Sequence, residues 1–305
     1  MGTGLFGFVL ILIVVAIGFE LTRQSTLSIQ KFGFNFWRTS TWDPVAGQFG
    51  AFPFIWGTLY SSILALLLAT PVSIGIAVFI SELCPHRLRQ PLVFLTELLA
   101  AIPSIIYGLW GIFVMVPLVR AFELWLPPGL RALPFFSGQP FGVGMLSAAL
   151  ILAVMVVPFT SSVAREVLKS VPLAQREGAY ALGATRLEAI GAALYYARTG
   201  IIGAVMLGFG RALGETMAVT MVIGNNPQVS LSLFAPQYTM AAVLANEFTE
   251  AADQLYLNAL IEIGLVLFVI TLIVNSLSRV LIWSMARPAK RLPPAAAVSP
   301  EASAA

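Results

Sequence analysis

The sequence has almost none of the side chains that build disulfides or histidine metal sites. Among its 305 residues are one cysteine, Cys84, and one histidine, His86. A lone cysteine excludes a disulfide within the chain. A lone histidine excludes metal sites built from clustered histidines and most histidine-based acid–base catalysis. We therefore predict no metal site and no catalytic residues.

Charge is scarce as well. Charged residues make up 10% of the chain and hydrophobic residues 58%, and the mean hydropathy is +0.90. A soluble protein of this length would need a more polar surface, so the composition predicts an integral membrane protein. The formal net charge is +3, but the basic residues are scattered between apolar runs. This pattern argues against a nucleic-acid partner.

The chain also lacks a nucleotide-binding loop of the Walker A type. Its only lysines are Lys31, Lys169 and Lys290, and none of them follows a glycine. The pattern G-x-x-x-x-G-K-[ST] is therefore absent, and the chain is not itself a P-loop ATPase. Any work driven by ATP must draw on another protein.

Long apolar runs dominate what remains. A helix that crosses a bilayer needs about 20 mostly apolar residues, and six segments reach or approach that length: 5–21, 54–80, 91–119, 141–164, 199–223 and 255–285. The first lacks a basic region before it and a clear cleavage site, so we interpret it as a retained helix. The predicted fold class is an all-α integral membrane protein with six transmembrane helices.

The distribution of basic residues predicts the orientation. The loops after the second and fourth segments, together with the C-terminal tail, carry ten Lys and Arg, against five in the other loops. By the positive-inside rule both termini are cytoplasmic. Residues 1–287 form a single transmembrane domain with its core at 54–285. The Ala- and Pro-rich stretch 288–305 is predicted to be a disordered cytoplasmic tail.

The inner loop at 165–198 has helix signals of its own. Ser170 can cap a helix that has Pro172 in its first turn, and Gly183 provides a stop. Thr185 and Glu188 then form a T-x-x-E capping box that starts the next helix. We predict two short helices beneath the membrane, either as an interfacial hairpin or as a docking element for a soluble partner.

This loop carries a family resemblance. EGAYALGATRLEAI resembles the E-A-A-x-x-x-G loop of ATP-binding-cassette importer permeases, with matches at Glu177, Ala179 and Gly183. Gly178 stands where the first Ala of that motif is usual. The Leu-Pro that the family commonly has about a dozen residues later is absent from this chain.

Two other stretches narrow the resemblance. GRALGETMAVTMVIGN (210–225) and ELLAAIPSIIYGLWG (97–111) look like phosphate importer permeases of the PstC type. The resemblance implies a permease that pairs with a sister permease, two ATPase subunits and a periplasmic phosphate-binding protein in a bacterial inner membrane. The chain would bind no cofactor, because the partner ATPases use ATP and Mg²⁺. The docking residues would be Glu177, Ala179, Gly183, Thr185 and Glu188.

Arg211 and Glu215 are the candidate pathway residues. The segment 199–223 reads as one helix with Arg211 at its centre, where an arginine costs about 2.5–3.5 kcal/mol to insert. Glu215 lies one turn further on and can pair with it. One interpretation is an internal salt bridge that fixes packing. The other is a site for a passing oxyanion, with Glu215 competing for Arg211 when the path is empty.

Small residues and a proline suggest where helices pack or break. Gly203, Gly210 and Gly214 fall on one stripe of the predicted fifth helix, which would allow close helix packing. Pro103 and Gly108 would loosen the third helix, either for packing or to line a substrate path.

Three other functions stay open at this point. An intramembrane enzyme would need catalytic groups that this composition hardly supplies. A passive channel or sensor would show no dependence on ATP. A permease for another oxyanion, such as molybdate or sulfate, or the sister phosphate permease would share most of these features.

Overall fold

The computed structural model describes residues 2–131 and 133–285, and within these ranges the chain is helical, with no named strand. Only two isolated bridges occur there, Asp43–Gln48 and Gly224–Gln237. The predicted tail at 288–305 lies outside the described residues.

Six helical segments in the described ranges are long and apolar enough to cross a membrane. They are Gly4–Gln24 within α1 (Gly2–Gln24), Phe52–Leu83, Ser104–Trp125, Met145–Lys169 (α8), Arg186–Leu213 (α10) and Gln254–Met285 (α13). The second joins α3 (Phe52–Val78) to a π-helical turn, η2 (Phe79–Leu83). The all-α fold class with six membrane helices is therefore confirmed.

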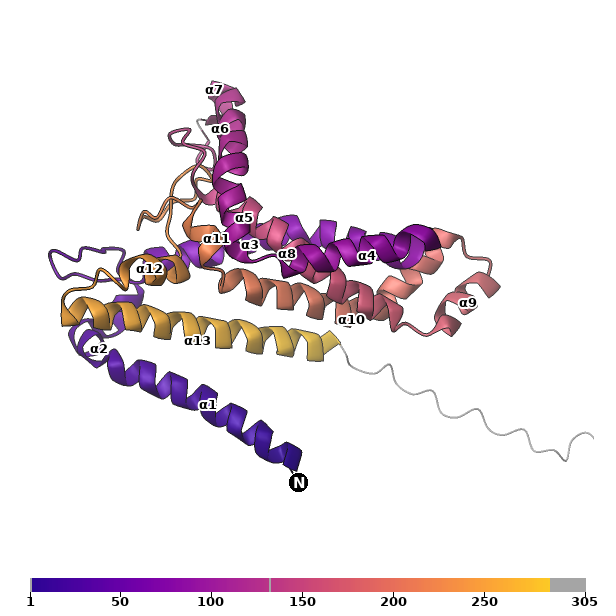
Figure 1. Cartoon of the computed structure of the whole chain (residues 1–305), viewed down its shortest axis with the longest axis horizontal. Coiled ribbons are helices and arrows are strands. Elements are labelled where there is room, and N and C mark those ends of the chain that lie inside the picture. The colour runs from indigo at the N-terminus through magenta and orange to yellow at the C-terminus, as the bar shows by residue number, and fades with distance from the viewer. Residues whose placement is uncertain (1, 132, 286–305) are drawn as a thin grey trace, which may run out of the picture.

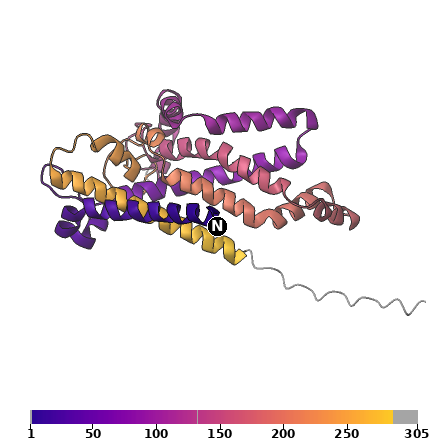
Figure 2. The ribbon, with the colours of Figure 1, turned by 60° about the horizontal axis from the view of Figure 1, so that its bottom comes forward.

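The helix α8 is the centre of the bundle (Figures 1 and 2). It packs against α3, α4 (His86–Ala101) and α10. Small side chains such as Ala148, Ala149 and Ala153 are buried along it. Small residues let helix backbones approach closely, which is the main source of packing energy where lipid replaces water.

The third predicted span, 91–119, is divided into separate helices at Pro103, the proline that the sequence singled out. The chain breaks at Ile102 and Pro103, whose ψ angles are 131° and 139°. It resumes as α5 (Ser104–Trp110), η3 (Gly111–Met115) and α6 (Val116–Trp125). Proline cannot supply the N–H of a continuing helix, and it drives the preceding residue out of the helical region. Figure 1 shows α4 lying along the bundle while α6 and the short α7 (Pro128–Arg131) point away from it.

One end of the bundle is closed by an aromatic cluster between α2 (Thr26–Phe32), the 3-10 helix η1 (Gly33–Trp37), α12 (Met240–Glu247) and α13. The Trp42 indole N–H and the Tyr256 hydroxyl both donate to Glu247, at 2.9 and 2.6 Å. Burial raises the pKa of Tyr238, which accepts a hydrogen bond from Asn246. This cluster fixes the loops that follow α1 and precede α13.

The first helix lies mostly outside this core. None of the residues in its apolar stretch is buried, and side chains such as Phe6 and Phe19 are 73% and 69% exposed. It lies beside α13 (Figure 2). At this contact Gly18 faces the ring of Phe268. An apolar helix without a polar face suits a lipid or helical environment.

Candidate functional site

The predicted fifth helix is interrupted beside its arginine. α10 ends at Leu213 and a short helix, α11 (Met217–Thr220), follows after residues 214–216. Arg211 therefore lies in the last turn of α10, and the prediction of one helix over 199–223 with Arg211 at its centre is wrong. Gly214 has a low helix propensity and stands as the C-cap of α10, with φ −93° and ψ 2°.

The two charged residues stand on either side of this interruption. Glu215 accepts a hydrogen bond from the backbone N–H of Ala218 at 3.4 Å, at the start of α11. Arg211 lies beside the free carbonyl groups at the end of α10. Each charge has the sign that the neighbouring helix end favours. No ion pair joins Arg211 to Glu215 in the described part of the chain, so the predicted pairing between them is wrong for this structure.

The guanidinium of Arg211 is exposed. Its nearest aromatic partner is the Phe159 ring on α8, whose centroid is 5.7 Å from Cζ. A cation over an aromatic face is held weakly at an exposed position, by about 0.5–1 kcal/mol. The fork of N–H donors thus remains accessible from outside this chain.

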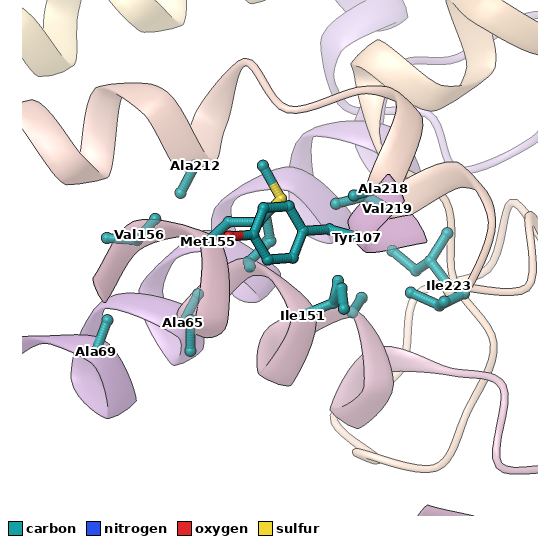
Figure 3. Close-up of a cluster of buried hydrophobic side chains, with 14 of the residues drawn as sticks. Ala65, Ala69, Tyr107, Ile151, Met155, Val156, Ala212, Ala218, Val219 and Ile223 are labelled. Carbon is teal, nitrogen blue, oxygen red and sulfur yellow. The ribbon is translucent and has the colours of Figure 1, made fainter. Parts of the chain in front are cut away.

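The break at Pro103 is closed by a side chain from the next helix. The Tyr107 hydroxyl donates to the carbonyl of Leu99 at 2.8 Å, which bridges the ends of α4 and α5. The Tyr107 ring lies in a buried apolar cluster that also contains Ala212 of α10 and Ala218 of α11 (Figure 3). Arg211 is exposed, and the residue that follows it in the chain, Ala212, is buried in this cluster.

The two interrupted helices meet directly at Gly108. A Cβ added at Gly108 would lie 2.5 Å from Sδ of Met221 and 3.1 Å from Cα of Ala218 in α11. One turn further, a Cβ at Gly111 would lie 2.9 Å from Val222. The structure thus places Gly108 at a close contact between α5 and α11, beside the interruption that carries Arg211.

The predicted glycine stripe is not the tightest contact of α10. Side chains of α13 lie at an ordinary 3.7 Å from a Cβ built at Gly203 or Gly210, and only the backbone of α10 itself approaches Gly214. A Cβ at Gly200 or Gly208 would instead overlap side chains of α8. Spacing along the helix did not reveal which face meets the central helix.

The inner loop forms a short exposed helix, α9 (Leu173–Ala181), which has no buried residue. Glu177 is exposed on it, and Tyr180 and Leu182 are 50% and 91% exposed. Ala179 is half-buried. Charged and large apolar side chains together on a protruding helix are typical of a protein-docking surface.

The two helix signals after α9 are confirmed. Gly183 has φ +83°, a left-handed conformation that favours glycine, and turns the chain back. Glu188 accepts hydrogen bonds from the Thr185 N–H and hydroxyl, at 2.7 and 2.8 Å, as α10 begins. Ser170 does not cap α9, because its hydroxyl donates to Val167 and Pro172 is the N-cap. The predicted loop 165–198 thus includes the end of α8 and the first turns of α10.

Sequence reasoning missed the ion pairs that fasten this loop. Arg176, at the start of α9, pairs with Glu82 at 2.6 Å. Arg165, which is 4% exposed, pairs with Glu97 of α4 at 3.0 Å. The only signal in the sequence was opposite charge in segments that the positive-inside rule places on the same side.

These features together define an all-α, multi-pass membrane protein of the transport-permease class. Residues 73–287 match the family model "Binding-protein-dependent transport system inner membrane component". The chain belongs to this family of inner-membrane permeases.

Similar proteins carry more specific names. The chain is 48% identical to the "Phosphate transport system permease protein PstC" of Haemophilus influenzae, over 93% of this chain and 91% of that protein. It is 46% identical to the protein of the same name in Mesorhizobium japonicum, over 88% and 85%. The inward-facing MetNI methionine ABC transporter superposes with a TM-score of 0.56 at 15% identity, over 77% of this chain and 95% of that chain. At that identity the likeness concerns the fold alone.

Proposed function

We propose that this chain is a transmembrane permease subunit of an ATP-driven importer of inorganic phosphate and that it forms half of the translocation pathway. The observation that carries the proposal is the exposed guanidinium of Arg211, held at the interruption between α10 and α11. The names of the relatives at 48% and 46% identity support phosphate rather than molybdate or sulfate.

An arginine suits this task for a physical reason. Its planar fork donates two parallel hydrogen bonds to oxyanion oxygens and stays charged at every relevant pH. A transport site must also release its ion. Glu215, on the other side of the same interruption, supplies a like charge that shortens the stay of the anion. Pro103 marks the break in the second interrupted helix. Gly108 allows the part after the break, α5, to lie close to α11, beside this interruption.

The proposed complex contains this chain, a sister permease, two ATPase subunits and a periplasmic phosphate-binding protein. The chain itself binds no cofactor, because ATP and Mg²⁺ belong to the ATPase subunits. The exposed helix α9 docks an ATPase subunit through Glu177 and Ala179. Gly183, Thr185 and Glu188 fix the turn from this helix into α10.

We propose that both termini are cytoplasmic, in a bacterial inner membrane. The N-terminal end of α1, the C-terminal end of α13 and the helix α9 lie toward the same end of the bundle in Figure 1. The excess of basic residues in the same loops supports placing this end inside.

The test of the function is accumulation of labelled phosphate in vesicles that hold the reconstituted complex with ATP and the binding protein. Uptake against a gradient is expected only when this chain and ATP are both present. Stronger competition by molybdate or sulfate than by unlabelled phosphate would assign another oxyanion. Uptake that ignores ATP would identify a passive channel.

A charge reversal at Glu177 tests the docking helix. Glu177→Arg is expected to lower the amount of ATPase that co-purifies with the permease about tenfold, because a central charged contact of an interface would become repulsive. The matched control is Gln175→Arg, which adds the same side chain at an exposed position of the same helix. Equal recovery of ATPase with both variants would contradict a docking role for Glu177.

A further inference from the structure

The cytoplasmic end of α3 has an irregular turn that presents one acidic side chain. η2 (Phe79–Leu83) is π-helical, and the Cys84 N–H reaches back five residues to the carbonyl of Phe79 at 2.7 Å. One extra residue in a turn rotates the following side chains by about 100° relative to a continuous α-helix. Glu82 lies in this turn and its side chain is only 13% exposed.

Glu82 faces an arginine of the docking helix. Arg176 donates to the Glu82 carboxylate at 2.6 Å, and its side chain is 20% exposed. The same guanidinium donates to the backbone carbonyls of Leu168 and Val171, both at 3.0 Å. One side chain therefore links α9 to the end of α3 and to the end of α8.

The start of α10 is tied to the same turn. Arg186 donates to the backbone carbonyl of Glu82 at 2.6 Å. α10 then runs without interruption from Arg186 to Leu213 and carries Arg211 in its last turn. A helix of 28 residues is about 42 Å long and moves as a stiff element. A displacement at its inner end is thus carried to the candidate pathway.

Apart from its contact with α10, which follows it in the chain, α9 has no buried residue to hold it in place. Charged hydrogen bonds that are shielded from water are stronger than those of exposed pairs. Loss of one partner also leaves the other charge poorly solvated. The Glu82–Arg176 pair is therefore the strongest side-chain link from α9 to a membrane helix in the described chain.

We propose that Glu82 is a positioning residue for transport: with Arg176 and Arg186 it clamps α9, α3 and α10 into one body, so that motion of the docked α9 reaches Arg211. This inference rests on the proposed function. The clamp transmits force and does not touch the transported ion.

The experiment uses the complete reconstituted complex and compares native protein, Glu82→Gln, Arg176→Gln, and the exchange Glu82→Arg with Arg176→Glu. Phosphate uptake, ATP hydrolysis and co-purified ATPase are measured for each. Both single variants are expected to keep the ATPase subunits and ATP hydrolysis while uptake falls about tenfold, a change of about 1.4 kcal/mol in coupling. The exchange is expected to restore most of the uptake.

A matched control changes a charge on the same face without touching the clamp. Among the described residues, Lys169 pairs only with Glu166 of its own helix, at 3.2 Å, so Lys169→Gln is expected to transport like the native protein. If the single variants assemble poorly, Glu82→Cys with Arg176→Cys in a Cys84→Ser background provides a second measurement. A short crosslinker is then expected to restore uptake, because the clamp stays closed throughout the cycle.

Uptake within twofold of the native value in both single variants would overturn the clamp. ATP hydrolysis that falls in proportion to uptake would also overturn it, since the residues would then serve assembly alone. Loss of uptake on crosslinking would also overturn the clamp, because the junction between Glu82 and Arg176 would then have to open during transport. A native complex that accumulates no phosphate would instead refute the proposed function itself.

Discussion

Uptake of phosphate is expected to fall about a hundredfold when Arg211 is replaced by glutamine. Glutamine keeps one N–H₂ group but loses the charge and the fork, so the passing ion loses about two charge-assisted hydrogen bonds. At roughly 1.5 kcal/mol each, this loss corresponds to about two powers of ten. The measurement is ATP-driven uptake of labelled phosphate by assembled complexes.

Two further variants separate this role from a structural one. Arg211→Lys keeps the charge and the favourable interaction with the end of α10, but it loses the fork of donors. Its phosphate uptake is expected to lie between that of the native protein and that of Arg211→Gln. Arg23→Gln removes an exposed arginine from the last turn of α1 and is expected to have no effect. Normal uptake by an assembled Arg211→Gln complex would remove Arg211 from the pathway.

The second large effect is expected at Gly108. Gly108→Val places carbon atoms where Met221 and the backbone of Ala218 already lie, so α5 and α11 must separate. Overpacking of this kind costs about 1–3 kcal/mol. Because the interruption carrying Arg211 adjoins this contact, we expect uptake to fall at least about tenfold while assembled complex is still recovered.

The control for this substitution is Gly75→Val in α3, where a Cβ meets nothing within 4 Å. This variant is expected to retain uptake. Gly108→Ala adds a single carbon at the same contact and is expected to lower uptake less than Gly108→Val. Adding Met221→Ala to Gly108→Ala removes the nearest atom, so the double variant is expected to recover part of the lost uptake. Equal uptake by Gly108→Val and Gly75→Val would show that the contact with α11 does not matter for transport.

The positions of the membrane helices could be predicted from the sequence because they depend on a one-dimensional property. A segment must offer enough consecutive apolar residues, and 5–21, 54–80 and 255–285 each fall within an observed helical segment. The start of α10 at Thr185 and the turn at Gly183 were predictable for a similar reason. A capping box and a left-handed glycine act within a few residues.

The sequence indicated a break near Pro103, because proline cannot continue a helix, but it did not indicate the break near Gly214. Hydropathy is unchanged across both, so a hydrophobic run cannot distinguish a continuous helix from two helices in contact. The Tyr107 hydroxyl compensates the break after α4 from eight residues away. The close contact at Gly108 depends on residues of α11 that lie more than a hundred positions later.

The sequence by itself determined an all-α membrane protein whose spans and turns follow from hydropathy and local backbone chemistry, and its motifs resembled those of importer permeases. Only the tertiary structure decided that Arg211 stands exposed at the end of a helix, apart from Glu215, and that Glu82 meets Arg176 across 94 positions. The physical reason is the distance along the chain over which each kind of interaction acts. Insertion and capping depend on neighbours in the chain, whereas ion pairs and helix contacts depend on which faces the packed bundle brings together.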